Sequence, residues 1–105
     1  MKAWLFSGLL LMAAPAWSKT IWIDVRTAQE YQTGHIVNAA NMPYQDIVTL
    51  AQEAGLDKAD RILLYCRSGR RSELAQIALQ QAGYTHVQNL GGFQDLVKTG
   101  AVKVE

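Results

Sequence analysis

One segment constrains the fold of this chain more than any other: an apolar stretch that runs into a cysteine, a polar loop and a helical pattern. Residues 61–65 read Arg-Ile-Leu-Leu-Tyr, as expected of a strand that is covered on both faces. Between residues 72 and 82, apolar side chains recur at the spacing of one helix face, and Gly83 ends the pattern. This apolar stripe consists of Leu74, Ala75, Ala78, Leu79 and Ala82. A covered strand that leads into a helix is typical of an α/β fold.

The remaining segments complete such a fold. Residues 20–25 are rich in β-branched and aromatic side chains and predict the first strand, whereas residues 61–65 form the central one. Thr27 and Glu30 match a capping box, which predicts a short helix that ends at Gly34. The other predicted elements are a brief extended segment at 39–41, helices at 46–54 and 93–99, and a strand at 87–90. Together they predict an α/β domain with a central, mainly parallel sheet flanked by helices.

The N-terminal segment, residues 1–18, has the pattern of a secretory signal peptide. Lys2 precedes an apolar run at residues 3–14, which is shorter than the roughly 20 residues that a membrane-spanning helix needs. Small residues at Ala16 and Ser18 suit a cleavage site before Lys19. We therefore predict a cleaved signal peptide rather than a retained membrane anchor. Residues 19–105 are too few for two domains of ordinary size and are expected to form one.

The charge balance excludes one broad class of function. Of the ten Lys and Arg residues, Lys2 lies in the predicted signal peptide, so nine remain against nine Asp and Glu residues. A mature chain without net charge lacks the basic excess by which nucleic-acid and membrane-surface proteins pair with phosphates. With one cysteine and the separated His35 and His86, the sequence also lacks a cluster of metal ligands. We expect no nucleic-acid, membrane or metal partner.

The single cysteine, Cys66, is the first candidate for chemistry. Without a second cysteine it is a buried inert thiol, an intermolecular linker or a reagent, and its residue type alone favours burial. Its position favours function, because ligand sites in open α/β sheets lie at the carboxyl ends of strands. The unpaired N–H groups and the dipole of the following helix are expected to favour the thiolate, which lowers the pKa of Cys66.

The loop after Cys66 reads Arg67-Ser68-Gly69-Arg70-Arg71 and has the composition of an anion-binding site. Gly69 lacks a β-carbon where the backbone must curl, so that several N–H groups can converge on the sulfur. A single arginine would be interpreted as a solvated surface charge, but three within five residues of the cysteine surround it with positive charge. Such a cradle can hold a thiolate, a persulfide or a bound oxyanion.

These features, and others in the same order along the chain, resemble the rhodanese family, whose active loop reads cysteine, five further residues and then a helix. The further marks are Asp24-Val25-Arg26, Glu30-Tyr31, Gly34-His35-Ile36, residues 39–43, Gly83-Tyr84 and Gly91-Gly92. They cover essentially the whole of residues 21–96, and with the predicted signal peptide the chain is similar to the exported single-domain members. The resemblance implies a rhodanese-like three-layer domain in a bacterial periplasm.

The resemblance also implies an activity. Cys66 would be the catalytic nucleophile of a thiosulfate sulfurtransferase, which takes sulfur from thiosulfate or a similar donor and passes it, through a persulfide, to cyanide or a thiol. No metal or organic cofactor is required. The residues implied to bind the donor are Arg67, Ser68, Gly69, Arg70 and Arg71.

Residues outside the loop that match the family are expected to support the site. Asp24 and Arg26 would lie behind it, and Arg26 is also spaced to pair with Glu30. His35 precedes an apolar residue and is interpreted as a turn histidine rather than as a base. The pair Gly91-Gly92 would let its backbone approach the active loop closely.

Two other functions share this pattern. A cysteine phosphatase or arsenate reductase uses a similar strand, loop and helix, but needs cysteine, five residues and then arginine to clamp a tetrahedral oxyanion. Ser72 stands at that position and arginine falls one residue early, at Arg71, which disfavours the clamp. A non-catalytic rhodanese-like module, or a persulfide carrier for a partner protein, would have the same fold, and the retained cysteine disfavours the inactive module. The physiological donor and acceptor, a protein partner and the oligomeric state are not predicted.

Overall fold

Short strands and helices alternate over residues 19–105, the part of the chain that this computed structural model describes. In chain order they are β2 (Thr20–Asp24), α1 (Ala28–Gln32), β3 (Ala40–Asn41), the 3-10 turn η1 (Tyr44–Asp46), α2 (Ile47–Glu53), β4 (Arg61–Cys66), α3 (Arg70–Gln81), β5 (His86–Gly92) and α4 (Phe93–Lys98). The predicted signal peptide, residues 1–18, lies outside the described residues. Within residues 19–105, no helix has the length and apolar character of a membrane span.

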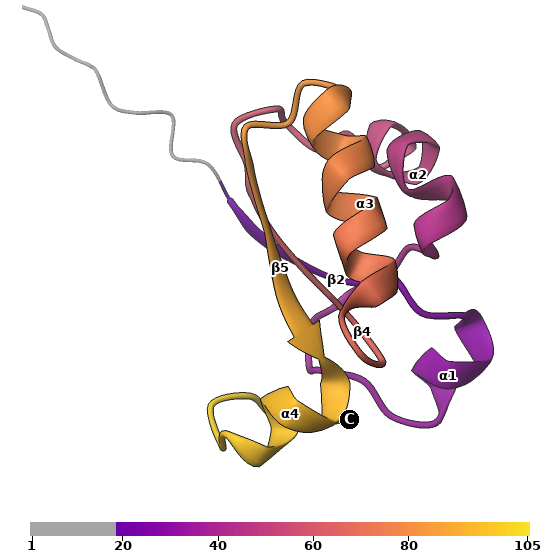
Figure 1. Cartoon of the computed structure of the whole chain (residues 1–105), viewed down its shortest axis with the longest axis vertical. Helices are drawn as coiled ribbons and strands as arrows, with labels where there is room; N and C mark the ends of the chain where they lie inside the picture. The colour runs from indigo at the N-terminus through magenta and orange to yellow at the C-terminus, as the bar shows by residue number, and fades with distance from the viewer. Residues whose placement is uncertain (1–18) are drawn as a thin grey trace, which may run out of the picture.

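The strands form one four-stranded sheet in which each neighbouring pair runs parallel. Their order is β3-β2-β4-β5, so that β2 and β4 are the inner strands. Asp24 lies opposite Tyr65, which brings the carboxyl ends of β2 and β4 to the same edge of the sheet. Figure 1 shows α2 and α3 on one side of the strands and α4 at the end of β5, on the other side. The predicted α/β fold, a central parallel sheet flanked by helices, is confirmed.

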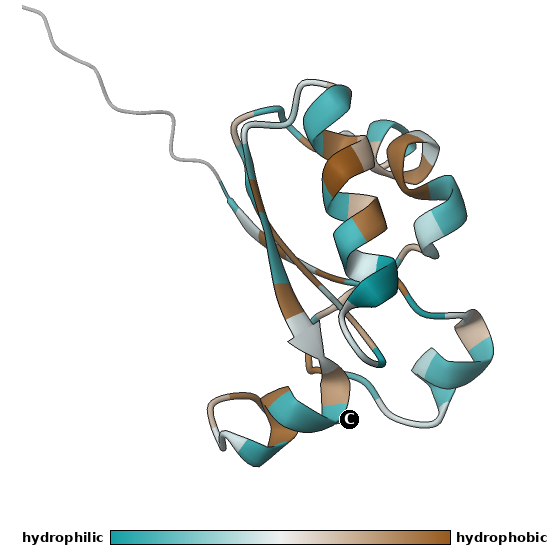
Figure 2. Cartoon of the chain, viewed as in Figure 1, coloured by the Kyte–Doolittle hydropathy of each residue, from teal (hydrophilic) through white to brown (hydrophobic). Residues whose placement is uncertain are grey.

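Side chains of β4 alternate between two hydrophobic cores, one on each face of the sheet. Ile62, Leu64 and Cys66 belong to the core that includes residues of α2 and α3. Tyr65 belongs to the opposite core, where its ring stacks on Phe93 of α4 at a centroid distance of 5.9 Å. Figure 2 shows hydrophobic stretches along the strands and helices with mixed faces around them. The strand is buried because both its faces are covered, as its apolar composition predicted.

Helix α3 differs from its prediction in its start and in its buried face. It begins at Arg70 rather than Ser72. The prediction relied on the spacing of apolar residues and could not detect a first turn that is polar. Leu74, predicted on the buried stripe, is 48% exposed. The buried residues follow a spacing of three and four and are Ser72, Ala75 and Leu79. The buried face of α3 therefore includes the serine next to the cysteine loop.

The capping box of α1 is confirmed in both directions. The Thr27 hydroxyl accepts from the Glu30 N–H at 3.2 Å, and the Glu30 carboxylate accepts from the Thr27 N–H at 3.0 Å. The helix ends before Gly34, whose φ of 145° lies in the region that favours glycine. These contacts fix α1 beside the carboxyl end of β2, close to the cysteine loop in Figure 1.

Candidate active site

Cys66 is the last residue of β4 and is fully buried. Its side chain belongs to the same core cluster as Ile62 and Leu64, because residues two and four positions apart on a strand share a face. The position at the carboxyl end of an inner strand agrees with the sequence prediction. The sulfur is therefore part of the hydrophobic core.

The loop that follows is shorter than predicted and turns directly into α3. Gly69 adopts a φ of 98° at the amino end of the helix, so Arg70 and Arg71 belong to the first helical turn. This left-handed conformation turns the Gly69 N–H toward the cysteine, and the N–H donates to Sγ at 2.8 Å. The loop therefore curls its backbone around the sulfur, as the central glycine predicted.

Two opposing effects act on the pKa of Cys66. Burial raises it, while hydrogen bonds from the Ser72 hydroxyl and from the N–H groups of Ser72, Ser68 and Gly69 lower it. The net result is a lowered pKa, the direction that the sequence predicted. The predicted backbone N–H groups are among the causes, whereas the Ser72 hydroxyl, the largest of the lowering contributions, was not predicted. The thiolate is thus stabilised by neutral groups that point at it.

Ser72 and Asn89 form the layer below the loop. The Ser72 Oγ lies 3.4 Å from Cys66 Sγ and 2.6 Å from Asn89 Oδ1. Asn89 of β5 also donates to the Gly69 carbonyl at 3.0 Å and accepts from the Gly91 N–H at 2.9 Å. One amide therefore ties the amino end of α3 to the last residues of β5.

Gly92 lets β5 approach the loop, as predicted from the glycine pair. Gly92 lies opposite Cys66 in the sheet register. A β-carbon at Gly92 would lie 2.7 Å from the carbonyl oxygen of Arg67, a distance that real contacts do not reach. The backbone of β5 therefore supports the loop from one side, while Ser72 supports it from below.

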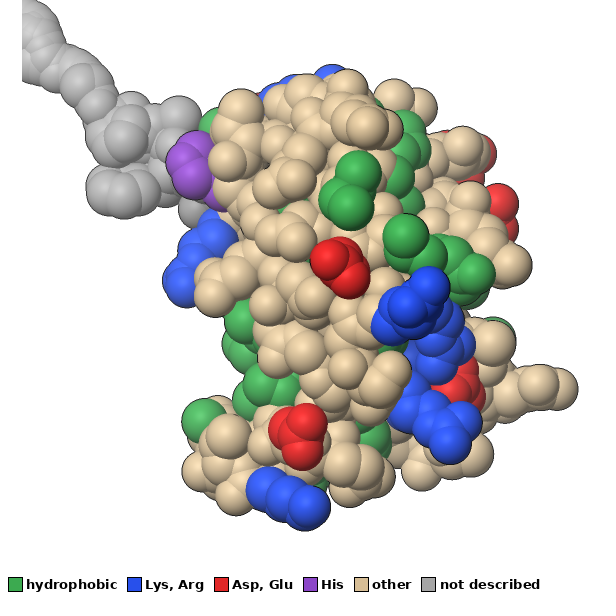
Figure 3. Space-filling view, in the orientation of Figure 1, with side chains coloured by type: hydrophobic (Ala, Val, Ile, Leu, Met, Phe, Trp, Pro, Cys, Tyr) green, Lys and Arg blue, Asp and Glu red, His purple; other side chains and the backbone are tan. Residues whose placement is uncertain are grey.

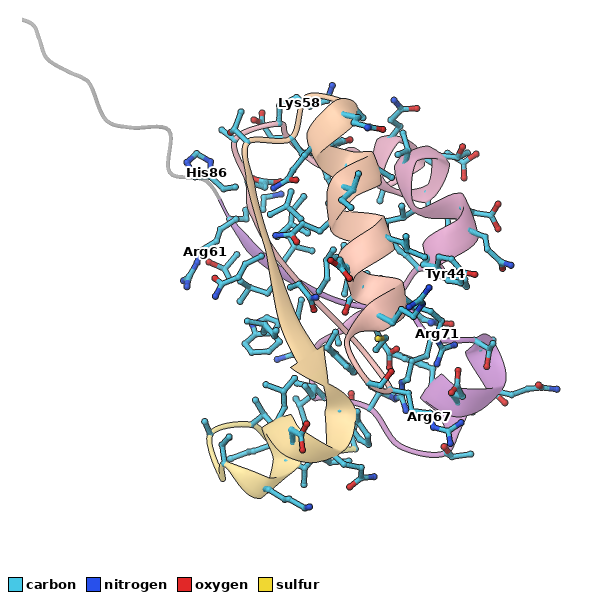
Figure 4. The ribbon with its side chains drawn as sticks, viewed as in Figure 1. Tyr44, Lys58, Arg61, Arg67, Arg71 and His86 are labelled. Carbon is cyan, nitrogen blue, oxygen red and sulfur yellow. The ribbon has the colours of Figure 1, made fainter. Side chains whose placement is uncertain are left out.

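The three arginines of the loop differ in their surroundings. Arg67 and Arg70 are exposed, and within residues 19–105 neither makes an ion pair. Arg71 is partly buried and donates to both carboxylate oxygens of Glu30, at 2.8 and 3.0 Å. Figure 4 shows Arg67 and Arg71 on the side of the loop that faces α1, and Figure 3 shows basic side chains gathered on this part of the surface. The sequence predicted this positive charge but not the pairing of Arg71.

The Glu30 carboxylate responds strongly to its partners. Its pKa falls from 4.5 to about 2, mainly because of the hydrogen bonds from Arg71. Burial acts in the opposite direction, and the Thr27 N–H lowers the pKa further. The predicted pairing of Glu30 with Arg26 is therefore wrong. Sequence spacing suggested Arg26, four residues before Glu30, as its partner. The fold instead brings Glu30 of α1 against Arg71 in the first turn of α3.

Arg26 pairs with Asp24 instead, behind the site. Its guanidinium donates to the Asp24 carboxylate at distances from 2.6 to 3.0 Å, and both residues are buried. Arg26 also donates to the Gly34 carbonyl at 2.7 Å, which holds the end of α1 to β2. The two residues predicted to support the loop thus lie together at the end of the neighbouring strand.

Three contributors to the site were missed as such from the sequence. Ser72 was considered only as the absence of a phosphatase arginine, Glu30 only as a cap and as a partner of Arg26, and Asn89 not at all. Asn89 carried a usable signal, because it is a polar side chain two residues before the predicted close approach of Gly91-Gly92 to the loop. The ring nitrogens of His35 face the Tyr31 carbonyl and the Glu105 carboxylate, and its backbone pairs with that of Glu105.

The arrangement is suited to nucleophilic chemistry on an anionic substrate. The thiol has a lowered pKa and accepts hydrogen bonds from backbone N–H groups. Arg67 and Arg70, which make no ion pair within residues 19–105, are exposed beside it in the sequence. Among residues 19–105, no group of three or more His, Cys, Asp or Glu side chains is placed to hold a metal ion. The chemical groups present are therefore a sulfur nucleophile, N–H donors and positive charge.

Comparisons with known proteins agree with this geometry. A family model described as the rhodanese-like domain matches residues 10–99. The thiosulfate sulfurtransferase PspE of Escherichia coli (strain K12) is 37% identical over 95 residues, which cover 90% of this chain and 91% of that protein. The chloroplastic thiosulfate sulfurtransferase 16 of Arabidopsis thaliana is 32% identical over 90 residues and covers 75% of each chain.

Solved structures give the same result. A rhodanese with anions from E. coli has a TM-score of 0.74 at 37% identity, covering 82% of this chain and 96% of that chain. The Rhodanese_3 like domain of the Anabaena sp Alr3790 protein also has a TM-score of 0.74, at 31% identity and with 82% and 98% covered. Because the family model and these relatives span most of its length, the chain belongs to the rhodanese family, whose members include sulfurtransferases.

Proposed function

We propose that this protein is a thiosulfate sulfurtransferase that moves a sulfane sulfur from thiosulfate, or a similar donor, to cyanide or a thiol. The observation that carries the proposal is the state of Cys66: its pKa is lowered and its Sγ accepts the Gly69 N–H at 2.8 Å. A thiolate at the carboxyl end of an inner strand, inside a cradle of N–H groups, is equipped to attack a sulfur atom.

The reaction consists of two displacements. In the first, the Cys66 thiolate attacks the outer sulfur of thiosulfate, a new S–S bond forms, and the bond to the sulfonate sulfur breaks. Sulfite leaves with the bonding electron pair, so the negative charge of the attacking thiolate ends on sulfite. The outer sulfur keeps the negative charge that it carried in thiosulfate and becomes the terminal sulfur of a Cys66 persulfide. In the second, cyanide or a thiolate attacks that outer sulfur and the Cys66 thiolate leaves. The enzyme returns to its starting state without oxidation or reduction by an outside reagent.

Two sets of groups around Cys66 have different roles: one stabilises the charge on the cysteine sulfur, and the other binds the anionic donor. The N–H groups of Ser68, Gly69 and Ser72 stabilise negative charge on the cysteine sulfur. Arg67 and Arg70, which are exposed and free of ion pairs in the described chain, attract the sulfonate end of the donor. We assign Arg71 a smaller part in donor binding than the sequence predicted, because Glu30 already occupies its guanidinium.

The residues behind the loop act through position. Asp24 and Arg26 hold the end of α1 near the loop through the Gly34 carbonyl. The relatives support the substrate class, since two of them are named thiosulfate sulfurtransferases and one solved structure is described as a rhodanese with anions. The pattern of residues 1–18 supports export to a periplasm before the protein meets its donor.

Two other functions are less well supported. A cysteine phosphatase or arsenate reductase needs an arginine where Ser72 lies, and this serine is buried below the loop with its hydroxyl bound to Asn89. A non-catalytic rhodanese-like module would have no use for a cysteine whose pKa is lowered by directed donors. A persulfide carrier for a partner protein shares the first displacement and differs only in turnover with small acceptors.

Intact mass measurement tests the proposal. Reduced protein treated with thiosulfate is expected to gain the mass of one sulfur atom at Cys66 and to lose it on addition of cyanide, with thiocyanate formed. The variant Cys66→Ala is expected to remain folded, at a cost of about 1 kcal/mol for the lost packing, and to form no thiocyanate. An unchanged mass of the free, reduced wild-type protein after thiosulfate would refute the persulfide. If thiosulfate labelled Cys66 but repeated turnover with small acceptors did not occur, the persulfide carrier would be favoured.

A further inference from the structure

The hydroxyl of Ser72 has one proton and three acceptors within reach. Its Oγ lies 2.6 Å from Asn89 Oδ1, 3.1 Å from the Gly69 carbonyl oxygen and 3.4 Å from Cys66 Sγ. A serine hydroxyl donates one hydrogen bond and accepts up to two. The three neighbours therefore cannot all receive its proton at the same time.

The side-chain amide of Asn89 has only one orientation that satisfies its neighbours. Its Nδ2 donates to the Gly69 carbonyl at 3.0 Å, and its Oδ1 accepts from the Gly91 N–H at 2.9 Å. The reversed amide would set its NH2 group against an N–H and its oxygen against a carbonyl. Because Oδ1 is an acceptor, a hydroxyl 2.6 Å away must donate to it. In that arrangement Ser72 presents lone pairs, not a proton, to the cysteine.

We propose that Ser72 is a hydroxyl switch whose orientation follows the charge on Cys66. With a neutral thiol, the Ser72 O–H donates to Asn89 and the Ser72 oxygen accepts the S–H of Cys66. When that S–H proton leaves to solvent, the Ser72 O–H rotates and donates to the thiolate. Asn89 Oδ1 still accepts the hydrogen bond from the Gly91 N–H, and the Gly69 carbonyl still accepts the one from Asn89 Nδ2. Each buried polar group therefore retains a hydrogen-bond partner.

The switch has a consequence for sulfur transfer that rests on the proposed function. In the persulfide, negative charge lies on the outer sulfur, and Sγ is a neutral divalent sulfur. The hydroxyl of Ser72 then returns to Asn89. When an acceptor removes the outer sulfur, charge reappears on Sγ and the hydroxyl turns back to it. Ser72 therefore stabilises the leaving thiolate more than the persulfide, which favours the second displacement.

Other charged and titratable groups near the loop are retained in this test. They are Arg67 and Arg70, Arg71 of α3 with Glu30 of α1 and Tyr44 of η1 beside it, and, on the Tyr65 face of the sheet, the buried Asp24 and Arg26. Arg71 interacts electrostatically with Cys66, and its guanidinium is paired with Glu30. Because none of these groups is changed when Ser72 is replaced, a change in the titration of Cys66 reports the loss of the Ser72 hydroxyl.

The test is the pH dependence of alkylation of Cys66, the single cysteine of the chain, by iodoacetamide. In Ser72→Ala, Asn89 still bonds Gly69 and Gly91, so no polar group is orphaned and the fold is expected to persist. We expect the midpoint of the profile to rise by about one pH unit, about tenfold in proton affinity, with the plateau rate at high pH unchanged. A midpoint equal to that of the wild type overturns the proposal.

Two further measurements separate the switch from a structural role. Ser72→Thr keeps the hydroxyl and is expected to keep the wild-type midpoint; a shift as large as that of alanine overturns the proposal. In the unmodified protein, the NMR resonance of the Gly91 N–H is expected to titrate with Cys66, because Oδ1 loses the competing hydroxyl as the thiolate forms. A fixed Gly91 resonance contradicts the switch. None of these experiments contains a sulfur donor. A result that contradicts the hydroxyl switch can therefore be distinguished from a result that contradicts persulfide formation.

Discussion

Two arginine–carboxylate pairs flank the cysteine loop, and they differ in burial rather than in chemistry. The side chains of Asp24 and Arg26 are 0% and 6% exposed, and their closest contact is 2.6 Å. The side chains of Glu30 and Arg71 are 27% and 26% exposed, and their closest contact is 2.8 Å. We call these the buried pair and the rim pair. In each, one guanidinium donates to both oxygens of one carboxylate.

Burial determines what each pair contributes. Arg26 of the buried pair also donates to the Gly34 carbonyl, and its guanidinium lies 4.4 Å from the centroid of the Phe93 ring, so that it joins β2, α1 and α4. If its carboxylate partner were lost, no water would replace it, and the free charge would be costly. The rim pair joins α1 to α3 but reaches solvent, which weakens it and lets its members exchange partners. The same kind of contact therefore stabilises the fold strongly in the buried pair and only weakly in the rim pair.

The largest expected effect comes from Asp24→Asn. Asparagine has nearly the same shape but no charge, so Arg26 would remain buried without a counterion. We expect the free energy of unfolding to fall by about 3 to 5 kcal/mol, measured by urea denaturation at neutral pH. Glu30→Gln is the matched control in the rim pair, with an expected loss below about 1 kcal/mol. Equal losses in the two variants would contradict the distinction between the pairs.

The second prediction extends the comparison to backbone contacts. Gly92→Ala places a β-carbon 2.7 Å from the Arg67 carbonyl oxygen, so that one of two backbone segments must shift. We expect a loss of about 1 to 3 kcal/mol and slower labelling of Cys66 by thiosulfate, because the loop is displaced. Unfolding free energies and the rate of mass gain measure the two effects.

Gly55→Ala is the control for Gly92→Ala. Gly55 has a φ of 74° but no atom within 4 Å of the added β-carbon, so the substitution strains the backbone without crowding a neighbour. Its cost is about 1 kcal/mol and its labelling rate stays that of the wild type. If both variants labelled equally fast, close support of the loop by β5 would not be needed for the reaction.

The buried region of the site was more predictable from the sequence than its rim. The apolar run 61–65 and the cysteine after it are local signals, and β4 and Cys66 lie where these signals indicated. The glycine pair likewise predicted that the backbone of this segment approaches the cysteine loop closely, and Gly92 makes this approach. Each of these predictions depends on the period of a strand or on the absence of a side chain, and such properties can be read without knowing the fold.

The partners of charged side chains could not be predicted in the same way. Glu30 and Arg71 are 41 residues apart, and nothing in their local sequence indicates the meeting of α1 with α3. Spacing favoured Arg26 as the partner of Glu30, but Arg26 turns back to Asp24, two residues before it in the strand. The Ser72 and Asn89 contact has the same origin, since it depends on the packing of α3 against β5. Long-range packing decides which of several chemically equivalent partners a side chain receives.

The smallest expected effect is a pH dependence in the rim pair. The pKa of Glu30 is about 2 in the folded chain, below the ordinary value of 4.5. A carboxylate with a lowered folded pKa adds stability above its unfolded pKa, and that stability is lost as the pH falls from 4.5 towards 2. Because Glu30 is partly exposed, solvent screening limits the contribution to about 1 kcal/mol or less.

Glu30→Gln isolates this contribution, since glutamine also serves in a capping box and leaves the start of α1 intact. We expect the difference in unfolding free energy between wild type and variant to be largest at neutral pH and low salt. It should shrink both on acidification through this range and on addition of salt, which screens exposed charges. Urea denaturation at a series of pH values measures it. A difference that is constant from pH 7 to pH 2 would mean that Arg71 does not hold Glu30 in solution, and Arg71 would then be as free as Arg67 to bind the donor.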